Sequence, residues 1–113
     1  MEIRKSLDSG LTLLALQGQV ALGESGRQLA DALREELESG SGHVLLEMSG
    51  IDYVDSTGIG ELVGYLIRFA KEQRRLVLVG ASERILLLLR VAGIEGMFRS
   101  YSDLEDARAA EAG

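Results

Sequence analysis

The side chains best suited to chemistry are two hydroxyls and a carboxylate in the run Asp55-Ser56-Thr57-Gly58. This run falls where an apolar strand pattern ends and a helical spacing of apolar residues begins. The first N–H groups of a helix lack partners within the helix, and the helix dipole makes that end electropositive. Ser56 or Thr57 is therefore expected to cap these donors while unmodified, and the same geometry would accept a phosphate on either hydroxyl. Gly58 and Gly60 add little helix propensity, but they permit another backbone to come close.

The composition excludes most other chemistry. The chain has 113 residues, no Cys, one His and a formal net charge of −6. Without Cys there is no disulfide, thiolate nucleophile or Cys-ligated zinc site, and a His-centred triad would depend on His43 alone. The acidic balance argues against nucleic acid as a direct partner, because phosphate binding needs a basic face. Arg74-Arg75 is accordingly interpreted as a solvated turn between a helix and a strand.

The spacing of the residues disfavours two interpretations: a hydrolase and a dinucleotide-binding protein. A hydrolase with Ser56 as nucleophile would need a G-x-S-x-G elbow or a second His, and the chain has neither. His43 is expected to be a solvated residue at the start of a strand. The glycines at 58, 60 and 64 do not form a dinucleotide fingerprint, because the third glycine comes one position too late.

The chain shows no signal for a membrane or for export. No segment approaches the roughly 18 consecutive apolar residues of a membrane span, and the N-terminal run Met1-Glu2-Ile3-Arg4-Lys5 lacks the apolar core of a signal peptide. We therefore expect a cytoplasmic protein without a membrane span. The length and the absence of a linker-like tract predict one domain over residues 1–113, with 109–113 as a frayed tail.

The spacing of apolar residues predicts alternating strands and helices. Strands are expected near 3–7, over 11–17, 44–48 and 76–79, and at 97–98, with a loop over 18–26. Helices are expected over 27–38, 59–70 and 83–92, the last capped by Ser82, and a terminal helix opens with a capping box at 102–105. This order predicts an α/β fold with a mostly parallel sheet and an antiparallel pair at its N-terminus. The fully apolar run 76–79 predicts a central strand covered on both faces.

The helix expected over 83–92 carries more apolar residues than one face needs. Ile85, Leu88, Leu89 and Ala92 fit a stripe that faces the core. Leu86 and Leu87 fall outside this stripe. Either a neighbouring segment covers them, or they form an exposed apolar patch for a partner or a homodimer.

The run Asp55-Ser56-Thr57-Gly58-Ile59-Gly60, after the lead-in Gly50-Ile51-Asp52-Tyr53-Val54, resembles the phosphorylation loop of STAS domains. Among these, bacterial anti-sigma factor antagonists (anti-anti-sigma factors) are the most similar. Further matching segments lie at 18–20, 44–48, 76–80 and 91–98, so the resemblance covers nearly the whole chain. It implies the STAS fold: an α/β domain with a single small mixed sheet of four to five strands and about four helices packed mainly on one face.

The same resemblance implies a regulatory role and not an enzyme. The unphosphorylated protein would bind an anti-sigma factor that is also a serine kinase, and this binding would release the sigma factor. The kinase would phosphorylate Ser56 and so end the interaction, and a metal-dependent serine phosphatase would reset it. ATP would belong to the kinase, so no cofactor or metal is expected in this chain. Asp55, Thr57, Gly58 and Gly60, around Ser56, are expected to contact the partner.

One position departs from the family pattern. Many members carry an Asp shortly after the early strand, where this chain has Ala21. Glu24 is expected to supply the partner-binding carboxylate instead.

An alternative function shares the same fold. The chain would then be a non-switching STAS subunit of a transport ATPase, or a component of a stressosome-type scaffold. The anti-sigma factor antagonist and the non-switching subunit differ in whether a kinase phosphorylates Ser56.

Overall fold

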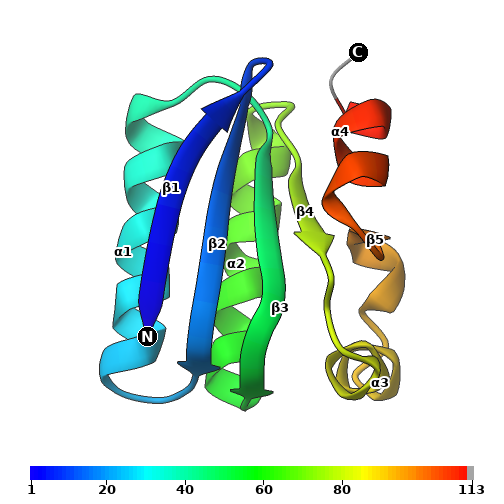
Figure 1. Cartoon of the computed structure of the whole chain (residues 1–113). Helices are drawn as coiled ribbons and strands as arrows, with labels where there is room; N and C mark the ends of the chain where they lie inside the picture. The colour runs from blue at the N-terminus through cyan, green and yellow to red at the C-terminus, as the bar shows by residue number, and fades with distance from the viewer. Residues whose placement is uncertain (112–113) are drawn as a thin grey trace.

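The structure is a computed structural model that describes residues 1–111, apart from the side chain of residue 8, and these residues form a mixed β-sheet with four α-helices (Figure 1). In chain order the elements are β1 (Glu2–Asp8), β2 (Leu11–Val20), α1 (Glu24–Ser39), β3 (Val44–Val54), α2 (Ser56–Lys71), β4 (Leu76–Val79), α3 (Glu83–Val91), the 3-10 turn η1 (Glu95–Met97), β5 (Arg99–Tyr101) and α4 (Leu104–Glu111). The five strands lie side by side in sequence order, β1-β2-β3-β4-β5. β1 pairs antiparallel with β2, and all other neighbours are parallel. The predicted fold class is confirmed.

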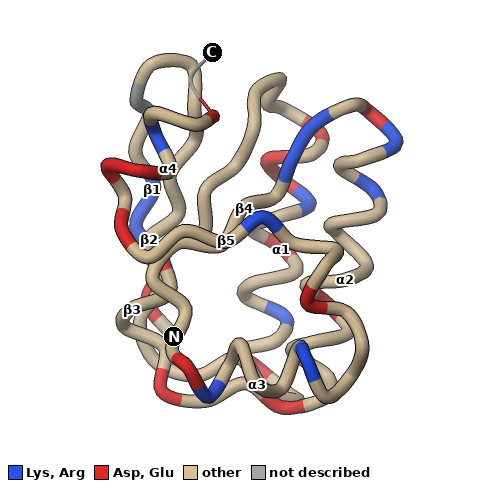
Figure 2. The backbone as a smooth tube through the Cα atoms, turned by 90° about the vertical axis from the view of Figure 1, so that its right-hand side faces the viewer, with Lys and Arg blue, Asp and Glu red and all other residues tan. Residues whose placement is uncertain are grey.

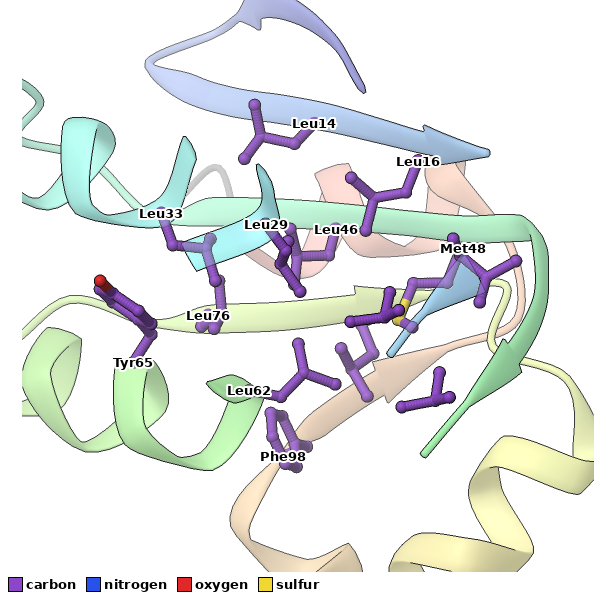
Figure 3. Close-up of a cluster of buried hydrophobic side chains, with 14 of the residues drawn as sticks. Leu14, Leu16, Leu29, Leu33, Leu46, Met48, Leu62, Tyr65, Leu76 and Phe98 are labelled. Atoms are coloured by element: carbon purple, nitrogen blue, oxygen red, sulfur yellow. The ribbon is translucent and has the colours of Figure 1, made fainter. Parts of the chain in front are cut away.

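Most of the helical packing lies on one face of the sheet. Figure 1 shows α1 and α2 behind the strands, and buried side chains from α1, α2 and α3 form one core with the sheet (Figure 3). Leu29, Leu62 and Ile85 are among the residues that these three helices contribute. α4 packs on the opposite face, where Ala107 lies among side chains of β2, β3 and β4. The prediction that the helices lie mainly on one face is therefore confirmed.

β4 is covered by both layers along its whole length. Leu76 and Leu78 belong to the core under α1, α2 and α3, whereas Val77 and Val79 belong to the core under α4. Each of the four residues is at most 1% exposed. Because successive side chains of a strand point to opposite faces, a strand with four consecutive apolar residues must be buried on both sides to keep all four from water. This prediction is confirmed.

β2 and β3 extend further than the sequence pattern predicts. The expected loop over 18–26 is wrong at both ends, because β2 continues to Val20 and α1 begins at Glu24. β3 continues past Met48 to Val54. The two extensions pair with one another, and the β2–β3 ladder contains two register shifts. The alternation of apolar and polar residues along one strand does not reveal such shifts. As a result both strands end side by side, directly before the candidate site.

The last strand lies later than predicted. The segment at 97–98 is not a strand: the 3-10 turn η1 ends at Met97, and β5 begins at Arg99. Phe98, between them, is buried in the larger core. The apolar character of this segment therefore reflects the burial of one aromatic ring and not a pleated strand.

α3 divides its apolar residues differently from the prediction. Ile85 and Leu89 are buried, as expected, and Ser82 caps the helix by accepting the N–H of Ile85 at 3.2 Å. Leu88 is 39% exposed and Ala92 is also exposed, so both were wrongly assigned to the core. The physical reason is that α3 is turned so that Ile85, Leu89 and, in part, Leu86 pack against the core, which leaves Leu88 and Ala92 on its other side.

The C-terminal segment is more ordered than the predicted tail. α4 continues through 109–111, so the frayed tail is wrong for these residues, and residues 112–113 lie outside the described residues. The Glu111 carboxylate is fully buried and accepts hydrogen bonds from Arg75 (2.9 Å), Arg99 (3.3 Å) and the Tyr101 hydroxyl (2.9 Å). The helix is capped by Asp103, whose Oδ1 accepts the N–H of Asp106, and not by the residue at 102 that the capping box predicts.

Arg74 is a structural residue and not part of a solvated turn. Its side chain is 6% exposed and donates to the carbonyls of Glu36 (3.0 Å), Leu37 (3.2 Å) and Gly42 (2.8 Å). Its guanidinium also lies over the Phe69 ring, 4.6 Å from the centroid. Arg74 therefore satisfies the carbonyls at the end of α1, where the helix dipole favours a cation.

Candidate functional site

Ser56 is the first residue of α2 and follows β3 after a single intervening residue, Asp55. Ser56 and Thr57 are both exposed. The N-cap is Asp55, which has an extended backbone and whose Oδ1 accepts the N–H of Gly58 at 2.8 Å. The prediction that Ser56 or Thr57 caps the helix is therefore wrong, because α2 begins at Ser56 itself and the preceding residue takes the capping position.

The Asp55 carboxylate also joins two distant segments of the chain. Its Oδ2 accepts the backbone N–H of Leu22 at 2.9 Å, in the loop between β2 and α1. The Asp55 backbone N–H donates to the carbonyl of Val20 at 3.1 Å. The hydrogen bonds from Leu22 and Gly58 lower the pKa of Asp55, because they favour its charged form. An ionised carboxylate therefore stands beside Ser56 at neutral pH.

Gly58 is buried where α2 begins against the ends of the strands. A Cβ at this position would lie 2.5 Å from the carbonyl oxygen of Val20 and 2.9 Å from a methyl carbon of Val54. Only a residue without a side chain lets the helix begin this close to β2 and β3. The predicted close approach is thus confirmed at Gly58. No part of the described chain approaches Gly60 in this way: the residue is exposed, and a Cβ there would meet nothing within 4 Å, so a close approach at Gly60 stays a prediction.

Ser56 forms part of the wall of an open groove of about 520 Å³ between the β3–α2 junction and α3. The junction side consists of Tyr53, Val54, Asp55, Ser56 and Ile59, and the α3 side of Arg84, Leu88, Val91 and Ala92. Large apolar side chains lie exposed on both sides, with Tyr53 45% exposed and Val91 79% exposed. The groove thus combines a serine hydroxyl, a carboxylate and a guanidinium with apolar side chains.

The remaining predicted site residues separate into two groups. Glu24 is exposed and begins α1, directly after the loop whose Leu22 N–H bonds to Asp55, so it lies at the same end of the sheet as Ser56 (Figure 1). Leu86 is half-buried and packs against the larger core. Leu87 is 50% exposed. Neither leucine is among the described residues that line the groove beside Ser56.

The apolar side of the groove was not found from the sequence. Tyr53, Arg84, Leu88 and Val91 line it, yet none of them was expected to contact a partner. A usable signal was present in α3, because Arg84, Leu88 and Val91 are spaced i, i+4 and i+7 and so share one helix face. The uninterrupted apolar run at 85–89 obscured this face.

His43 and Ser56 lie beyond opposite ends of β3. The 11 residues of this strand separate them by far more than hydrogen-bond distance, since each residue of a strand adds about 3.3 Å. His43 is half-buried, and its Nδ1 accepts the backbone N–H of Arg75 at 2.9 Å, so it is not the solvated residue that was expected. His43 therefore cannot act as a base for Ser56.

None of the described helices α1 to α4 has both the length and the apolar character needed to cross a membrane.

Comparison with known proteins places the chain in a family. The sequence model of the family described as "Mlab, STAS domain" matches residues 3–100. A curated relative, the anti-sigma-B factor antagonist of Staphylococcus aureus, is 27% identical over 70 residues, which are 62% of this chain and 65% of the relative. This chain therefore spans less than two thirds of the length of that relative.

Solved structures share the fold at low identity. An anti-sigma-factor antagonist (STAS) domain protein from Planctomyces limnophilus has a TM-score of 0.85 at 20% identity, covering 98% of each chain. A sulfate transporter family protein from Wolinella succinogenes has a TM-score of 0.75 at 22% identity, covering 95% of this chain and 88% of that one. The matched family, the sheet order and the helix arrangement agree, and the chain belongs to the STAS domain family.

Proposed function

We propose that this protein is an anti-sigma factor antagonist. In its unphosphorylated form it binds an anti-sigma factor that is also a serine kinase, and this binding releases the sigma factor. Phosphorylation of Ser56 by the same kinase ends the interaction. The proposal is supported by the name of the S. aureus relative, an anti-sigma-B factor antagonist, and by the family to which the chain belongs.

The observation that carries the proposal is the exposed Ser56 at the N-terminus of α2. Asp55 supplies the helix cap, so the Ser56 hydroxyl is not required for folding and can accept a phosphoryl group. Gly58 brings the start of α2 close to the ends of β2 and β3, so this hydroxyl lies at that end of the sheet. Thr57, beside it, and Gly60, one turn later, are proposed to contact the partner.

Glu24 is proposed to border the same partner surface from the loop side. Its position directly after the loop tied to Asp55 supports this assignment. Leu86 and Leu87, the other residues proposed for partner binding, are less favoured, because Leu86 packs against the core and neither lines the groove among the described residues.

Charge accounts for the switch. A phosphate on Ser56 adds about −1.5 to −2 charge at pH 7, next to a carboxylate whose lowered pKa keeps it ionised. The N-terminus of α2 offsets part of this charge within the domain. At an interface, however, an unpaired charge that is taken out of water costs several kcal/mol. Because about 1.4 kcal/mol corresponds to a tenfold change in affinity, one phosphate is enough to dissociate the complex.

The other components belong to the partners. ATP is bound by the kinase, and a metal-dependent serine phosphatase restores the unphosphorylated form. The chain acts as one domain in the cytoplasm and needs no cofactor of its own.

The direct test is phosphorylation by purified anti-sigma factor kinases of the organism that carries this chain. Incubation with MgATP is expected to add the mass of one phosphate, which peptide mass spectrometry assigns to Ser56. The Ser56→Ala variant should remain unmodified, whereas Thr57→Ala serves as the matched control and should be phosphorylated. Phosphate on Thr57 alone, or on neither residue with any of the kinases, contradicts the proposal.

A non-switching STAS subunit of a transport ATPase, or a component of a stressosome-type scaffold, is the second candidate. The observation that favours it is the exposed apolar face of α3, which suits a permanent partner as well as a transient one. Under this alternative the chain copurifies with its partner and receives no phosphate from the kinases.

A further inference from the structure

A second groove lies toward the other end of α2 from Ser56. It has a volume of about 360 Å³ and runs between the last turns of α2 and the segment where η1 leads into β5. Its apolar side chains are all aliphatic: Leu66, Ile67, Ala70, Leu76 and Met97. Ile67 and Met97 are each 44% exposed, whereas Leu76 is 1% exposed and so forms the base.

Three guanidinium groups, those of Arg74, Arg75 and Arg99, line the same groove. Figure 2 views the side of the molecule that carries β4 and β5, and basic positions (blue) gather there between the end of α2 and the start of β5. Arg75 and Arg99 share the carboxylate of Glu111, and Glu72 lies 3.5 Å from Arg74. Three guanidinium groups thus pair with two carboxylates, which leaves one positive charge in excess in a chain whose net charge is −6.

Arg75 and Arg99 have donors left for a second anion. A guanidinium carries five N–H donors, and Glu111 accepts from the Nη1 group of each arginine, at 2.9 Å and 3.3 Å. The two arginine side chains are about half exposed although Glu111 is fully buried. Arg74, in contrast, is buried and donates to backbone carbonyls, so it contributes charge to the groove.

We propose that this groove binds a small amphiphilic anion, namely a carboxylate on an aliphatic tail. The carboxylate bonds to Arg75 and Arg99, which already hold the carboxylate of Glu111, and arginine donors match the geometry of this group. The tail lies along Ile67, Leu76 and Met97. The inference does not depend on the proposed function, because the groove includes no residue of the β3–α2 junction among its described lining.

The dimensions of the groove favour a small molecule over a protein. Its volume falls within the range of about 300–1,000 Å³ that is typical of small-molecule sites. A stable protein interface needs about 800 Å² on each partner. Of the large apolar side chains that the described residues expose, only Ile67 and Met97 line this groove, which is too few for the core of such an interface.

The direct test is a titration of the isotope-labelled full chain with octanoate, followed by the NMR signals of its backbone amides. Three probes separate the contributions: acetate lacks the tail, 1-octanol lacks the charge, and octylammonium reverses it. Octanoate is expected to cause saturable shifts concentrated in residues 66–76 and 97–99. Each of the other probes should bind at least about tenfold more weakly, because it lacks either the charge-assisted hydrogen bonds or the apolar contact.

Two variants test the two halves of the groove. Arg99→Gln removes one of the arginines, and its matched control is Arg34→Gln, an equally exposed and ion-paired arginine on α1. Ile67→Glu places a carboxylate beside the tail, and its matched control is Leu7→Glu on β1. Each groove variant is expected to bind octanoate about tenfold more weakly, and each control should bind it like the wild type. If Arg99→Gln lowers the circular dichroism melt because Glu111 loses a partner, Ile67→Glu decides the question, since this side chain is 44% exposed.

Three results would overturn the proposal. Equal binding of octanoate and 1-octanol would show adsorption to apolar surface without recognition of the anion. Octanoate shifts centred on Tyr53 and Val91 would place the ligand in the other groove. If vesicles of phosphatidylglycerol shift residues 66–76 but octanoate does not, the groove meets a membrane surface and not a free carboxylate. Because phosphorylation of Ser56 is measured in a separate assay, none of these results bears on the proposed function.

Discussion

Asp55 Oδ2 accepts the backbone N–H of Leu22 at 2.9 Å, although the two residues are 33 positions apart in sequence. The other oxygen of the same carboxylate accepts the N–H of Gly58 at 2.8 Å. One side chain therefore holds the β2–α1 loop and the start of α2 in a fixed relation. This relation brings Glu24 and Ser56 to the same end of the sheet, so Asp55 organises the surface that the proposed function assigns to a partner.

The two hydrogen bonds of Asp55 can be tested separately. Asn at this position keeps one oxygen for the Gly58 N–H, but its NH2 group would face the Leu22 N–H, donor against donor. Ala removes both acceptors. We expect melting temperatures in the order wild type, Asp55→Asn, Asp55→Ala, with the Ala variant lower by about 4–8 °C. Faster hydrogen exchange at Leu22 in Asp55→Asn should accompany the change, and equal melting of the Asn variant and the wild type would show that the Leu22 bond contributes nothing.

Two glycines of α2 should respond to the same substitution with opposite sign. In Gly58→Ala the new Cβ would lie 2.5 Å from the Val20 carbonyl oxygen, so the start of α2 must shift. We expect a loss of about 1–3 kcal/mol in unfolding free energy. Gly60→Ala adds helix propensity in open space and should gain about 0.5–1 kcal/mol. Urea denaturation measures both, and a Gly58→Ala variant as stable as Gly60→Ala would contradict the close approach described here.

The positions of strands and the identities of core residues were predictable where burial alone determines which residues are apolar. The run at 76–79 is apolar at every position and has the length of a short strand, which fits a strand buried on both faces. The run at 85–89 is equally apolar but helical, and five consecutive apolar residues do not indicate which face meets the core. Packing against the sheet selected Ile85 and Leu89, and it left Leu88 for the groove.

Polar contacts with backbone groups were the least predictable features. Arg74 was interpreted as solvated because an arginine in a turn usually is, yet three carbonyls at and beyond the end of α1 receive its hydrogen bonds. The cap of α2 was assigned to a hydroxyl because Ser, Thr and Asp all serve as N-caps and the residue types alone do not show where the helix begins. In both cases the deciding partner is a backbone atom whose position depends on the whole fold.

Ser56→Asp should separate binding from folding. A carboxylate at the first position of α2 interacts favourably with the helix dipole, and this gain roughly offsets repulsion from Asp55. We therefore expect the melting temperature to stay within about 3 °C of the wild type. Affinity for the anti-sigma factor kinase should fall at least about tenfold, because the added charge must be desolvated at the interface. A Ser56→Asp variant that binds the kinase like the wild type would exclude charge as the cause of the switch.

Glu111 should make the stability of the fold depend on pH. Burial raises the pKa of its carboxyl, but the hydrogen bonds from Arg75 and Tyr101 and the charge of Arg99 outweigh this effect, so the pKa lies below its ordinary value of 4.5. A carboxyl whose pKa is lowered by folding contributes stability above its unfolded pKa, and this contribution disappears as the pH falls through the folded value. We expect Glu111→Gln to reduce the unfolding free energy by about 1–3 kcal/mol at pH 7. The reduction should shrink as the pH falls through the lowered folded pKa, because the wild-type carboxyl is then protonated as well. The effect is modest because both arginines are about half exposed. Urea denaturation over a series of pH values from 7 downward measures the difference, with Glu2→Gln on the exposed β1 edge as the control, and a Glu111→Gln deficit that is the same at every pH would contradict the assignment.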